Sequence, residues 1–294
     1  MAESKSTILR GMTRDGSARI LVINSRELVN GAVKAHKTAP TATAAIGRLI
    51  SAASMVGTML PEDGDSLTMS FTSDGEIEKM IAVADYYGNI KCYIKNPLAD
   101  PPRKSNGKLD VGRAVGQGTF SIVRDVGGDD PQCGTTEIVS GEIAEDIATY
   151  FAKSEQIPTL LSLGVLVDKD YTCLAAGGVL IQLMPFPDDE TVSLIERNAS
   201  DLTNISAMFE RGLSNEEIAE IAMRDIPYDL FDTLEVEYKC DCSRERMQKK
   251  IRSLGKGEIK KMFDEQQSEG KSRVLTAMCR FCNSAYDFTE NDLL

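Results

Sequence analysis

The pattern of hydrophobic and polar residues divides the first 185 residues into stretches with the period of strands and stretches with the period of helices. Leu67, Met69 and Phe71 alternate with polar residues, as in a strand with one buried face. Residues 40–60 are rich in alanine and contain no proline after the first position, which is typical of a buried helix. The pattern predicts strands over residues 18–23, 66–71, 77–85, 90–94, 119–126, 160–167 and 172–183, and helices over residues 40–60 and 141–153.

The pattern changes after the Pro185-Phe186-Pro187 sequence, where prolines end the last strand and three acidic residues can begin a helix. From residue 186 to about Asp232 we expect only short helices. One is marked by a capping box beginning at Ser214. Helices this short need a partner surface, and the C-terminal segment is the nearest candidate.

Met208, Phe209 and Met223 fall at apolar positions of these helices. Packing in a core is the main interpretation for each of them, and adaptable binding of varied partners is the alternative.

The composition is that of an ordinary globular chain. Of the 294 residues, 42% are apolar and 27% are charged, which excludes fibrous, disordered and secreted disulfide-rich classes. No run of apolar residues is long enough to span a membrane, and the first residues lack the features of a signal peptide, so we expect a cytoplasmic protein. The net charge of −12 disfavours binding of nucleic acid by the chain as a whole.

The reactive side chains are few and unevenly placed. His36 is the one histidine, so a histidine-rich metal site is excluded, and we interpret His36 as a polar residue on a helix near the surface. Cys92 and Cys173 lie in apolar surroundings typical of inert, buried thiols. Cys133 lies in a turn-rich stretch, and none of these three cysteines receives a role.

The other four cysteines form two close pairs near the end of the chain. Cys240 and Cys242 are separated by one residue, Cys279 and Cys282 by two, and thirty-six residues lie between the pairs. This spacing is typical of a tetrahedral four-thiolate zinc site, although an iron–sulfur cluster has the same ligands. Residues 234–294 are too few to build a large core, so a bound metal is expected to hold this segment together. We therefore predict one zinc ion per chain, bound by the four cysteines.

Such a site is either an inert support or a redox switch. Lys239, Arg244, Arg246 and Arg280 flank the ligands, and nearby positive charge keeps thiols ionised and reactive. This observation favours a switch without deciding the question.

Two further classes of function remain as alternatives. Residues 239–294 hold 12 basic and 9 acidic side chains together with three aromatic residues near the end, which is weak support for a zinc-ribbon nucleic-acid binder. Cys279 and Cys282 could serve a thiol–disulfide oxidoreductase, but a strand-then-helix context is lacking. Gly270-Lys271-Ser272 resembles the end of a phosphate loop, yet Glu265 stands where the leading glycine is required, so no nucleotide cofactor is predicted.

The whole chain resembles the 33-kDa heat-shock chaperone family, the redox-regulated holdases of bacteria. The most specific part of the resemblance is the CDCSRER string joined to a distant CRFC string. Less specific support comes from two glycine-containing stretches. The segments that carry the resemblance are residues 240–246, residues 279–282 with Tyr286 and Phe288, residues 116–125 and residues 177–182.

The resemblance implies a non-enzymatic chaperone of α+β class in three parts. These are an N-terminal domain of sheets with packed helices (residues 1–185), a helical linker (186–233) and a C-terminal zinc domain (234–294). It implies an inactive, reduced, zinc-bound state. Oxidation would then form the disulfides Cys240–Cys242 and Cys279–Cys282, release zinc and unfold the C-terminal region.

The resemblance also implies partners. The activated protein, often as a homodimer, would hold unfolded client proteins without using ATP. It would later pass them to ATP-driven foldases of the 70-kDa heat-shock type. Neither nucleic acid nor a membrane is expected as a partner.

Overall fold

The computed structural model describes residues 5–128, 130–268, 270 and 272–294; Lys271 of the phosphate-loop-like stretch therefore lies outside the described residues. The chain forms two compact units, Met1–Lys239 and Cys240–Leu294. Both units contain antiparallel strands and helices, so the predicted α+β class is confirmed.

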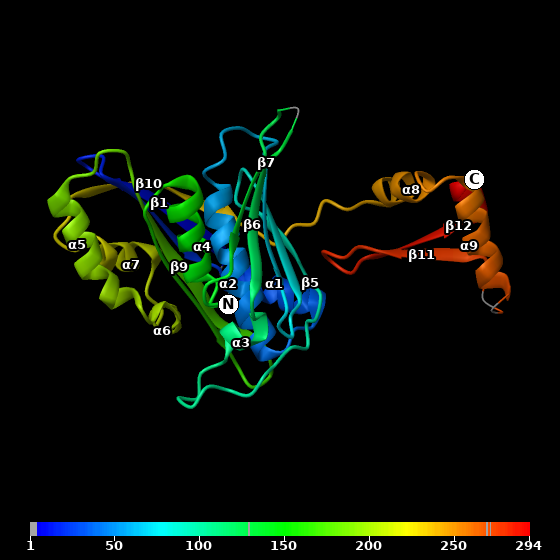
Figure 1. Ribbon diagram of the computed structural model, residues 1–294, viewed down its shortest axis with the longest axis horizontal. Coiled ribbons are helices and arrows are strands. Elements are labelled where there is room, and N and C mark those ends of the chain that lie inside the picture. The colour runs from blue at the N-terminus through cyan, green and yellow to red at the C-terminus, as the bar shows by residue number, and fades with distance from the viewer. Residues whose placement is uncertain (1–4, 129, 269, 271) are drawn as a thin grey trace. The chain divides into compact units, whose positions relative to one another are not determined.

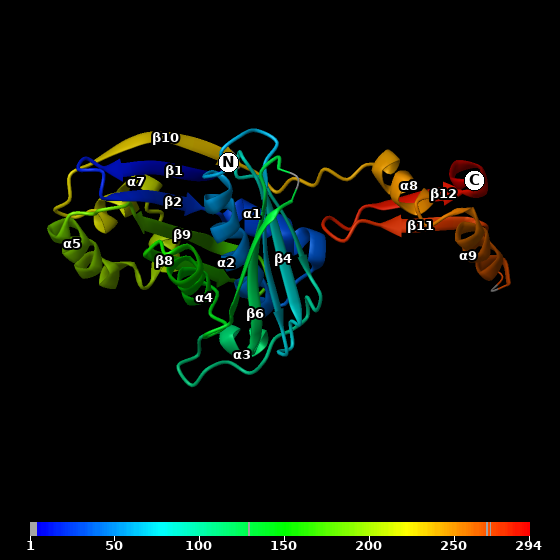
Figure 2. The ribbon, with the colours of Figure 1, turned by 45° about the horizontal axis from the view of Figure 1, so that its top comes forward.

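The first unit contains a five-stranded antiparallel sheet in the order β10-β1-β2-β9-β8, and Figure 2 shows β10, β1 and β2 side by side. Its edge strands are β10 and β8, and two of its neighbouring pairs, β10 with β1 and β2 with β9, join strands that are far apart in the sequence. Its strands are β1 (Ser6–Thr13), β2 (Ala18–Asn24), β8 (Thr159–Val167), β9 (Cys173–Leu183) and β10 (Tyr228–Val236).

A second antiparallel sheet in the same unit has the order β5-β4-β3-β6-β7. Its inner face is built by alternation: Leu67, Met69 and Phe71 of β3 are fully buried, as their period of two predicts. The strands are β3 (Ser66–Ser73), β4 (Lys79–Asp85), β5 (Ile90–Ile94), β6 (Gly118–Asp125) and β7 (Gln132–Glu137).

Helix α2 (Pro40–Gly57) packs against both sheets and forms the centre of the larger core (Figure 1). Its small residues allow close approach: a Cβ on Gly57 would lie 2.7 Å from Ala84 Cβ, and one on Gly47 would lie 2.9 Å from Val165. The other elements around this core are α1 (Arg26–His36), α3 (Val111–Val115), α4 (Ala144–Tyr150) and the π-helix η1 (Phe151–Glu155).

The short helices after residue 186 cover the face of the first sheet opposite α2 (Figure 1). Met208, Phe209 and Met223 are buried in a second core with residues of β1, β2 and β9, so their assignment to a core is confirmed. The expectation that the C-terminal segment provides the partner surface is therefore wrong. The elements are α5 (Asp189–Ala199), the 3₁₀-helix η2 (Ser200–Leu202), α6 (Ile205–Glu210) and α7 (Asn215–Ala222).

Strand β10 corrects a second expectation, because residues 228–232 belong to a strand and not to a helix. The strand runs to Val236 and pairs along its whole length with β1. It lies in the first unit, and the boundary between the compact units comes after Lys239.

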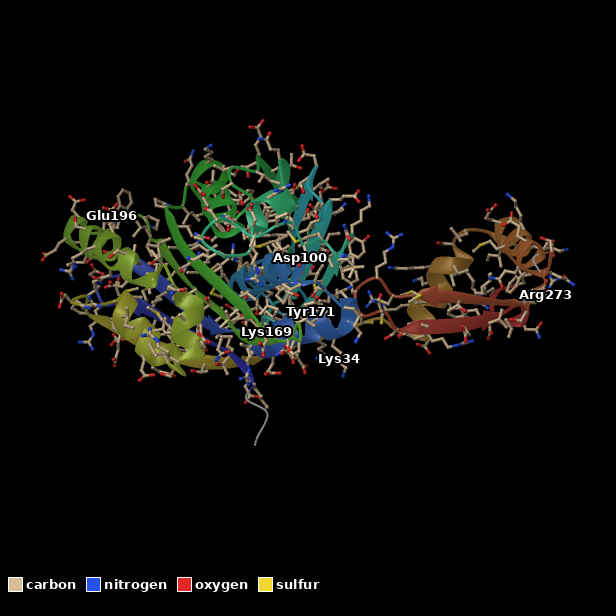
Figure 3. The ribbon with its side chains drawn as sticks, turned by 90° about the horizontal axis from the view of Figure 1, so that it is seen from below. Lys34, Asp100, Lys169, Tyr171, Glu196 and Arg273 are labelled. Atoms are coloured by element: carbon tan, nitrogen blue, oxygen red, sulfur yellow. The ribbon has the colours of Figure 1, made fainter. Side chains whose placement is uncertain are left out.

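The second unit is a hairpin with three helices. Five side chains form its core, namely Ile259, Phe263, Leu275, Phe288 and Leu293. Arg273, labelled in Figure 3, joins the hairpin to a helix: its guanidinium lies 5.9 Å from the ring centre of Phe263 and bonds Glu290 at 2.9 Å. The elements are α8 (Arg244–Arg252), α9 (Lys256–Ser268), β11 (Val274–Met278), β12 (Ala285–Thr289) and α10 (Glu290–Leu293).

The isolated reactive residues lie in the first unit. Cys92 and Cys173 are buried, which confirms that part of their interpretation, and burial raises the pKa of each thiol to about 12, which disfavours the reactive thiolate. Cys133 is exposed on β7. His36 lies on α1, as predicted, but it is buried and its Nε2 is 2.8 Å from the carbonyl oxygen of Cys92, so its placement near the surface is wrong.

Among the described residues, the helices are all too short or too polar to traverse a lipid bilayer.

Candidate metal centre

Two loops of the second unit present the four clustered cysteines. Cys240 and Cys242 come directly before α8, whose N-cap Ser243 accepts a hydrogen bond from the Arg246 N–H at 3.2 Å. Cys279 and Cys282 lie in the loop between β11 and β12. This loop is tight, because the Cys279 carbonyl accepts from the Asn283 N–H at 2.8 Å and the Cys279 N–H donates to the Ser284 carbonyl at 2.9 Å. Asn283 adopts a positive φ of 57°, which asparagine tolerates well.

The fold brings the four sulfur atoms together. All four Sγ atoms lie within 4.8 Å of one another. Cys240 Sγ is 3.6 Å from Cys279 Sγ, and Cys242 Sγ is 3.3 Å from Cys282 Sγ. Around a tetrahedral ion with metal–sulfur bonds of about 2.3 Å, sulfur atoms lie roughly 3.8 Å apart, so this cluster fits such an ion.

Without a cation, the four thiols of the cluster do not ionise readily together. Burial raises the pKa of the Cys240 thiol above its usual range, and it raises that of Cys242 as well. For Cys282 burial acts in the same direction, but hydrogen bonds with Ser284, Cys242 and Cys240 together outweigh it and lower the pKa to about 7. Four thiolates this close repel one another, and a divalent metal ion removes that repulsion.

The basic residues expected to surround the ligands mostly face acidic partners. Arg246 pairs with Asp241, Lys239 Nζ lies 3.6 Å from Glu237, and Arg280 is exposed. These acids offset much of the positive charge that would favour free thiolates.

Arg244 is engaged in a similar way. Its Nη2 lies 3.1 Å from Asp292, and its guanidinium lies 4.8 Å from the ring centre of Phe288. The prediction that nearby cations activate the cysteines is therefore not supported at Arg244 or Lys239, whereas the charge of Arg246 still interacts with Cys240 and Cys242.

Two polar side chains contact the sulfurs without having been predicted to do so. The Tyr286 hydroxyl lies 3.1 Å from Cys242 Sγ and donates to the Cys242 carbonyl at 3.3 Å, and this contact raises the pKa of Tyr286 to about 12. Ser284 Oγ lies 3.2 Å from Cys282 Sγ. Both residues follow the second cysteine pair within four positions, so a search for hydroxyl groups beside the ligands would have found them.

Comparisons with known proteins identify the family. A profile described as "Hsp33 protein" matches residues 6–289. The chain belongs to the Hsp33 family. It is similar to the 33 kDa chaperonin of Agathobacter rectalis (38% identity, 97% of each chain) and to that of Clostridium botulinum (39% identity, 98% of this chain and 96% of the relative).

A solved structure supports the same assignment. The crystal structure of the 33 kDa chaperonin of Thermotoga maritima matches with a TM-score of 0.90 and 33% identity, over 99% of this chain and 97% of the other. As an Hsp33 protein, the chain is a redox-regulated holdase, a chaperone that is not an enzyme. The alternative of a thiol–disulfide oxidoreductase is therefore wrong, and the chaperone assignment replaces that of a zinc-ribbon nucleic-acid binder.

Proposed function

We propose that this Hsp33 chain is a holdase switched by Cys240, Cys242, Cys279 and Cys282, which bind one zinc ion in the reduced, inactive state. The observation that carries the proposal is the convergence of four Sγ atoms within 4.8 Å. An all-sulfur tetrahedral set suits zinc, which has no redox chemistry of its own, so electrons can leave only from the sulfurs.

Oxidation then acts on the ligands. In each pair, Cys240 with Cys242 and Cys279 with Cys282, two sulfurs lose two electrons to an oxidant and form one S–S bond. With hydrogen peroxide as the oxidant, each pair reduces one molecule to two waters by taking up two protons. A disulfide is a poor metal ligand, so zinc leaves.

Loss of zinc removes the main support of the second unit. Its core consists of five buried side chains, too few to fold a segment of this size without a staple. Structural zinc sites contribute about 10–16 kcal/mol to folding in small peptides, which exceeds what such a core can supply. The oxidised segment is therefore expected to unfold.

The surface that holds clients is proposed to lie under the helical segment. Helices α5, α6 and α7 bury Leu9, Ile20, Val22, Val179 and Ile181 of the first sheet. If unfolding spreads to these helices, both their apolar faces and this sheet face become available to unfolded chains. This gives the three predicted parts distinct roles: residues 1–185 as the core, residues 186–233 as the movable cover and, within residues 234–294, the second unit Cys240–Leu294 as the sensor.

Partners follow from the same scheme. Unfolded clients are implied by membership of a chaperone family. We further propose homodimerisation on activation, transfer of clients to an ATP-driven 70-kDa heat-shock foldase, and a cytoplasmic location, where thiols remain reduced until oxidative stress.

The test follows metal release, free thiols and anti-aggregation activity together in one sample of the full chain during treatment with peroxide at raised temperature. We expect one equivalent of zinc to leave as four thiols disappear, and activity to rise with both. Mapping of disulfides by mass spectrometry should show Cys240–Cys242 and Cys279–Cys282. Equal activity of the reduced and oxidised chains would contradict the switch, and iron in the reduced protein would contradict the zinc assignment.

A further inference from the structure

A row of ion pairs holds strand β10 against β1. The two strands pair from Ser6 with Val236 to Thr13 with Tyr228. Beside this ladder, three cations from β1 and its flanks face three acids of β10. Arg10 makes two bonds to Asp232, Nε to Oδ1 at 2.8 Å and Nη2 to Oδ2 at 2.5 Å. The three pairs are Lys5 with Glu235, Arg10 with Asp232 and Arg14 with Asp229.

Little else attaches this edge strand. Of the nine residues of β10, Val236 alone is buried, while Leu230 is 40% and Phe231 is 63% exposed. The register shifts opposite Arg10 and Gly11, so that Phe231 lies in a bulge. Exposed ion pairs are individually weak. Strand β10 is therefore held mainly by backbone hydrogen bonds and charge, and its separation from β1 removes only Val236 from the larger core and the partly buried Tyr228 from the second.

The position of β10 in the chain connects its separation from β1 to unfolding of the second unit. The strand lies between helices α5–α7 and Cys240, and only Glu237, Tyr238 and Lys239 connect it to the cysteine. These three residues are bound to Ile90, whose N–H donates to the Glu237 carbonyl at 3.0 Å and whose carbonyl accepts from the Lys239 N–H at 2.8 Å. Unfolding that spreads along the chain from Cys240 to the helices must release β10 on the way.

We propose that the edge of β1 is an interaction surface for an extended, acidic segment of an unfolded polypeptide, and that β10 occupies this surface until activation. This inference rests on the proposed function, because oxidation of the second unit is the event that frees β10. A free β1 edge offers unpaired backbone groups to an incoming strand. Lys5, Arg10 and Arg14 then attract acidic side chains and repel basic ones.

Gly11 adapts this edge to the close approach of a second backbone. A Cβ at this position would lie 2.7 Å from the Asp229 carbonyl oxygen and 3.1 Å from Leu230, while its nearest neighbour on β2, Ile20, is in ordinary contact at 3.4 Å. A methyl group on residue 11 therefore pushes against β10 and leaves β2 undisturbed. Gly11→Ala is thus a means to loosen β10 without any oxidant.

The first experiment uses β10 itself as the probe. A fluorescent peptide with the sequence of β10, YDLFDTLEV, is titrated with the reduced and the oxidised full chain. We expect binding to the oxidised chain only. A matched peptide carrying Asp229→Lys, Asp232→Lys and Glu235→Lys should bind about tenfold more weakly, since three surface ion pairs are lost. An oxidised chain with Arg10→Glu and Arg14→Glu should reverse that preference.

The second experiment requires no oxidant. Reduced Gly11→Ala protein should keep its metal, show faster hydrogen exchange over residues 228–236 and bind the β10 peptide. Gly128→Ala is the control, because among the described residues beyond its chain neighbours the nearest atom to its added Cβ is the Asp130 carbonyl oxygen, in ordinary contact at 3.8 Å. Peptide binding by neither the oxidised chain nor the Gly11→Ala variant overturns the inference, as does equal binding of both peptides.

The experiments distinguish a failure of this inference from a failure of the proposed function. If oxidation releases zinc and activates the holdase while the amides of β10 stay protected, this inference is wrong and the proposed function stands. If oxidation produces no holdase activity, the proposed function is wrong, and the Gly11→Ala variant still tests the surface.

Discussion

Cys279 is the most deeply buried of the four clustered cysteines, with 3% of its surface exposed. Its backbone also closes the loop between β11 and β12 through two hydrogen bonds. The residue therefore has two tasks: it is a candidate ligand and it fixes the geometry of Cys282.

Replacing Cys279 with serine tests whether this residue is a ligand and whether the second unit depends on the metal. A hydroxyl group binds zinc poorly, so we expect Cys279→Ser to lower the metal content from about one equivalent to well below half, and to make residues 240–294 sensitive to protease. Elemental analysis and limited proteolysis provide the measurement. Cys133→Ser, an exposed position on β7, should change neither. Full metal content in Cys279→Ser would show that this residue is no ligand.

The carboxyl group of Asp232 predicts that the attachment of β10 to β1 depends on pH. The hydrogen bonds from Arg10 hold the pKa of this carboxyl below its ordinary value of 3.8. A group whose pKa is lowered by folding stabilises the folded state above its unfolded pKa, and that contribution disappears as the pH falls through the folded pKa. The attachment of β10 should therefore weaken below about pH 4, by on the order of 0.5 kcal/mol for this exposed pair.

Hydrogen exchange of the β10 amides at pH 6 and pH 3, corrected for intrinsic rates, measures this effect. In Asp232→Asn the difference between the two pH values should shrink, because the titrating carboxyl is gone. An unchanged difference would assign the pH dependence to other groups.

Individual residues were predictable where chemistry alone decides their role. The four clustered cysteines could be chosen from their spacing, and Cys92 and Cys173 from their apolar neighbours. His36 was misplaced because its burial depends on Cys92, fifty-six positions away, whose carbonyl is its partner. Local sequence carries no sign of such a contact.

Among the elements, the strands that alternate or are fully apolar were predicted close to their observed bounds. Five strands were not predicted, namely β1, β7, β10, β11 and β12. Strand β10 has one buried residue, and its conformation comes from pairing with β1, more than two hundred positions earlier. The local sequence indicates a strand only through a few aromatic and β-branched residues between acids. This pattern is too weak to distinguish the segment from the short helices before it.

Helix α6 provides a prediction at this scale. The ring of Phe209 lies against the bare backbone of β9, where a Cβ on Gly177 would be 2.1 Å from its Cε2 atom. Phe209→Ala should destabilise the packing of α6 by about 3–5 kcal/mol. We expect the reduced variant to suppress client aggregation in part, since the cover over the first sheet loosens.

Thermal unfolding and light scattering with an aggregating client measure both effects. Leu98→Ala, at a position that is 71% exposed, is the matched control and should behave like the parent. A Phe209→Ala protein that is less stable but has no activity when reduced would show that α6 is not part of the cover.

The whole molecule consists of two units with cores of very different size. The first unit has two large cores, whereas the second has five buried side chains and the cysteine cluster. Chelation of metal under reducing conditions should therefore unfold residues 240–294 and leave the first unit folded. Hydrogen exchange with mass spectrometry distinguishes the two. Protection of the second unit after complete removal of metal would show that its core is sufficient.

The connection between β10 and Cys240 is short. Glu237, Tyr238 and Lys239 are the residues between them, so a segment that becomes disordered at Cys240 adjoins the backbone bridge at Ile90 directly. Chemical change at the sulfurs in this way starts fraying at the end of an edge strand. A flexible insertion of ten Gly and Ser residues between Lys239 and Cys240 should move the start of the disorder away from this bridge. The lengthened chain should still lose zinc on oxidation, measured by a chromogenic chelator, but gain holdase activity more slowly than the parent.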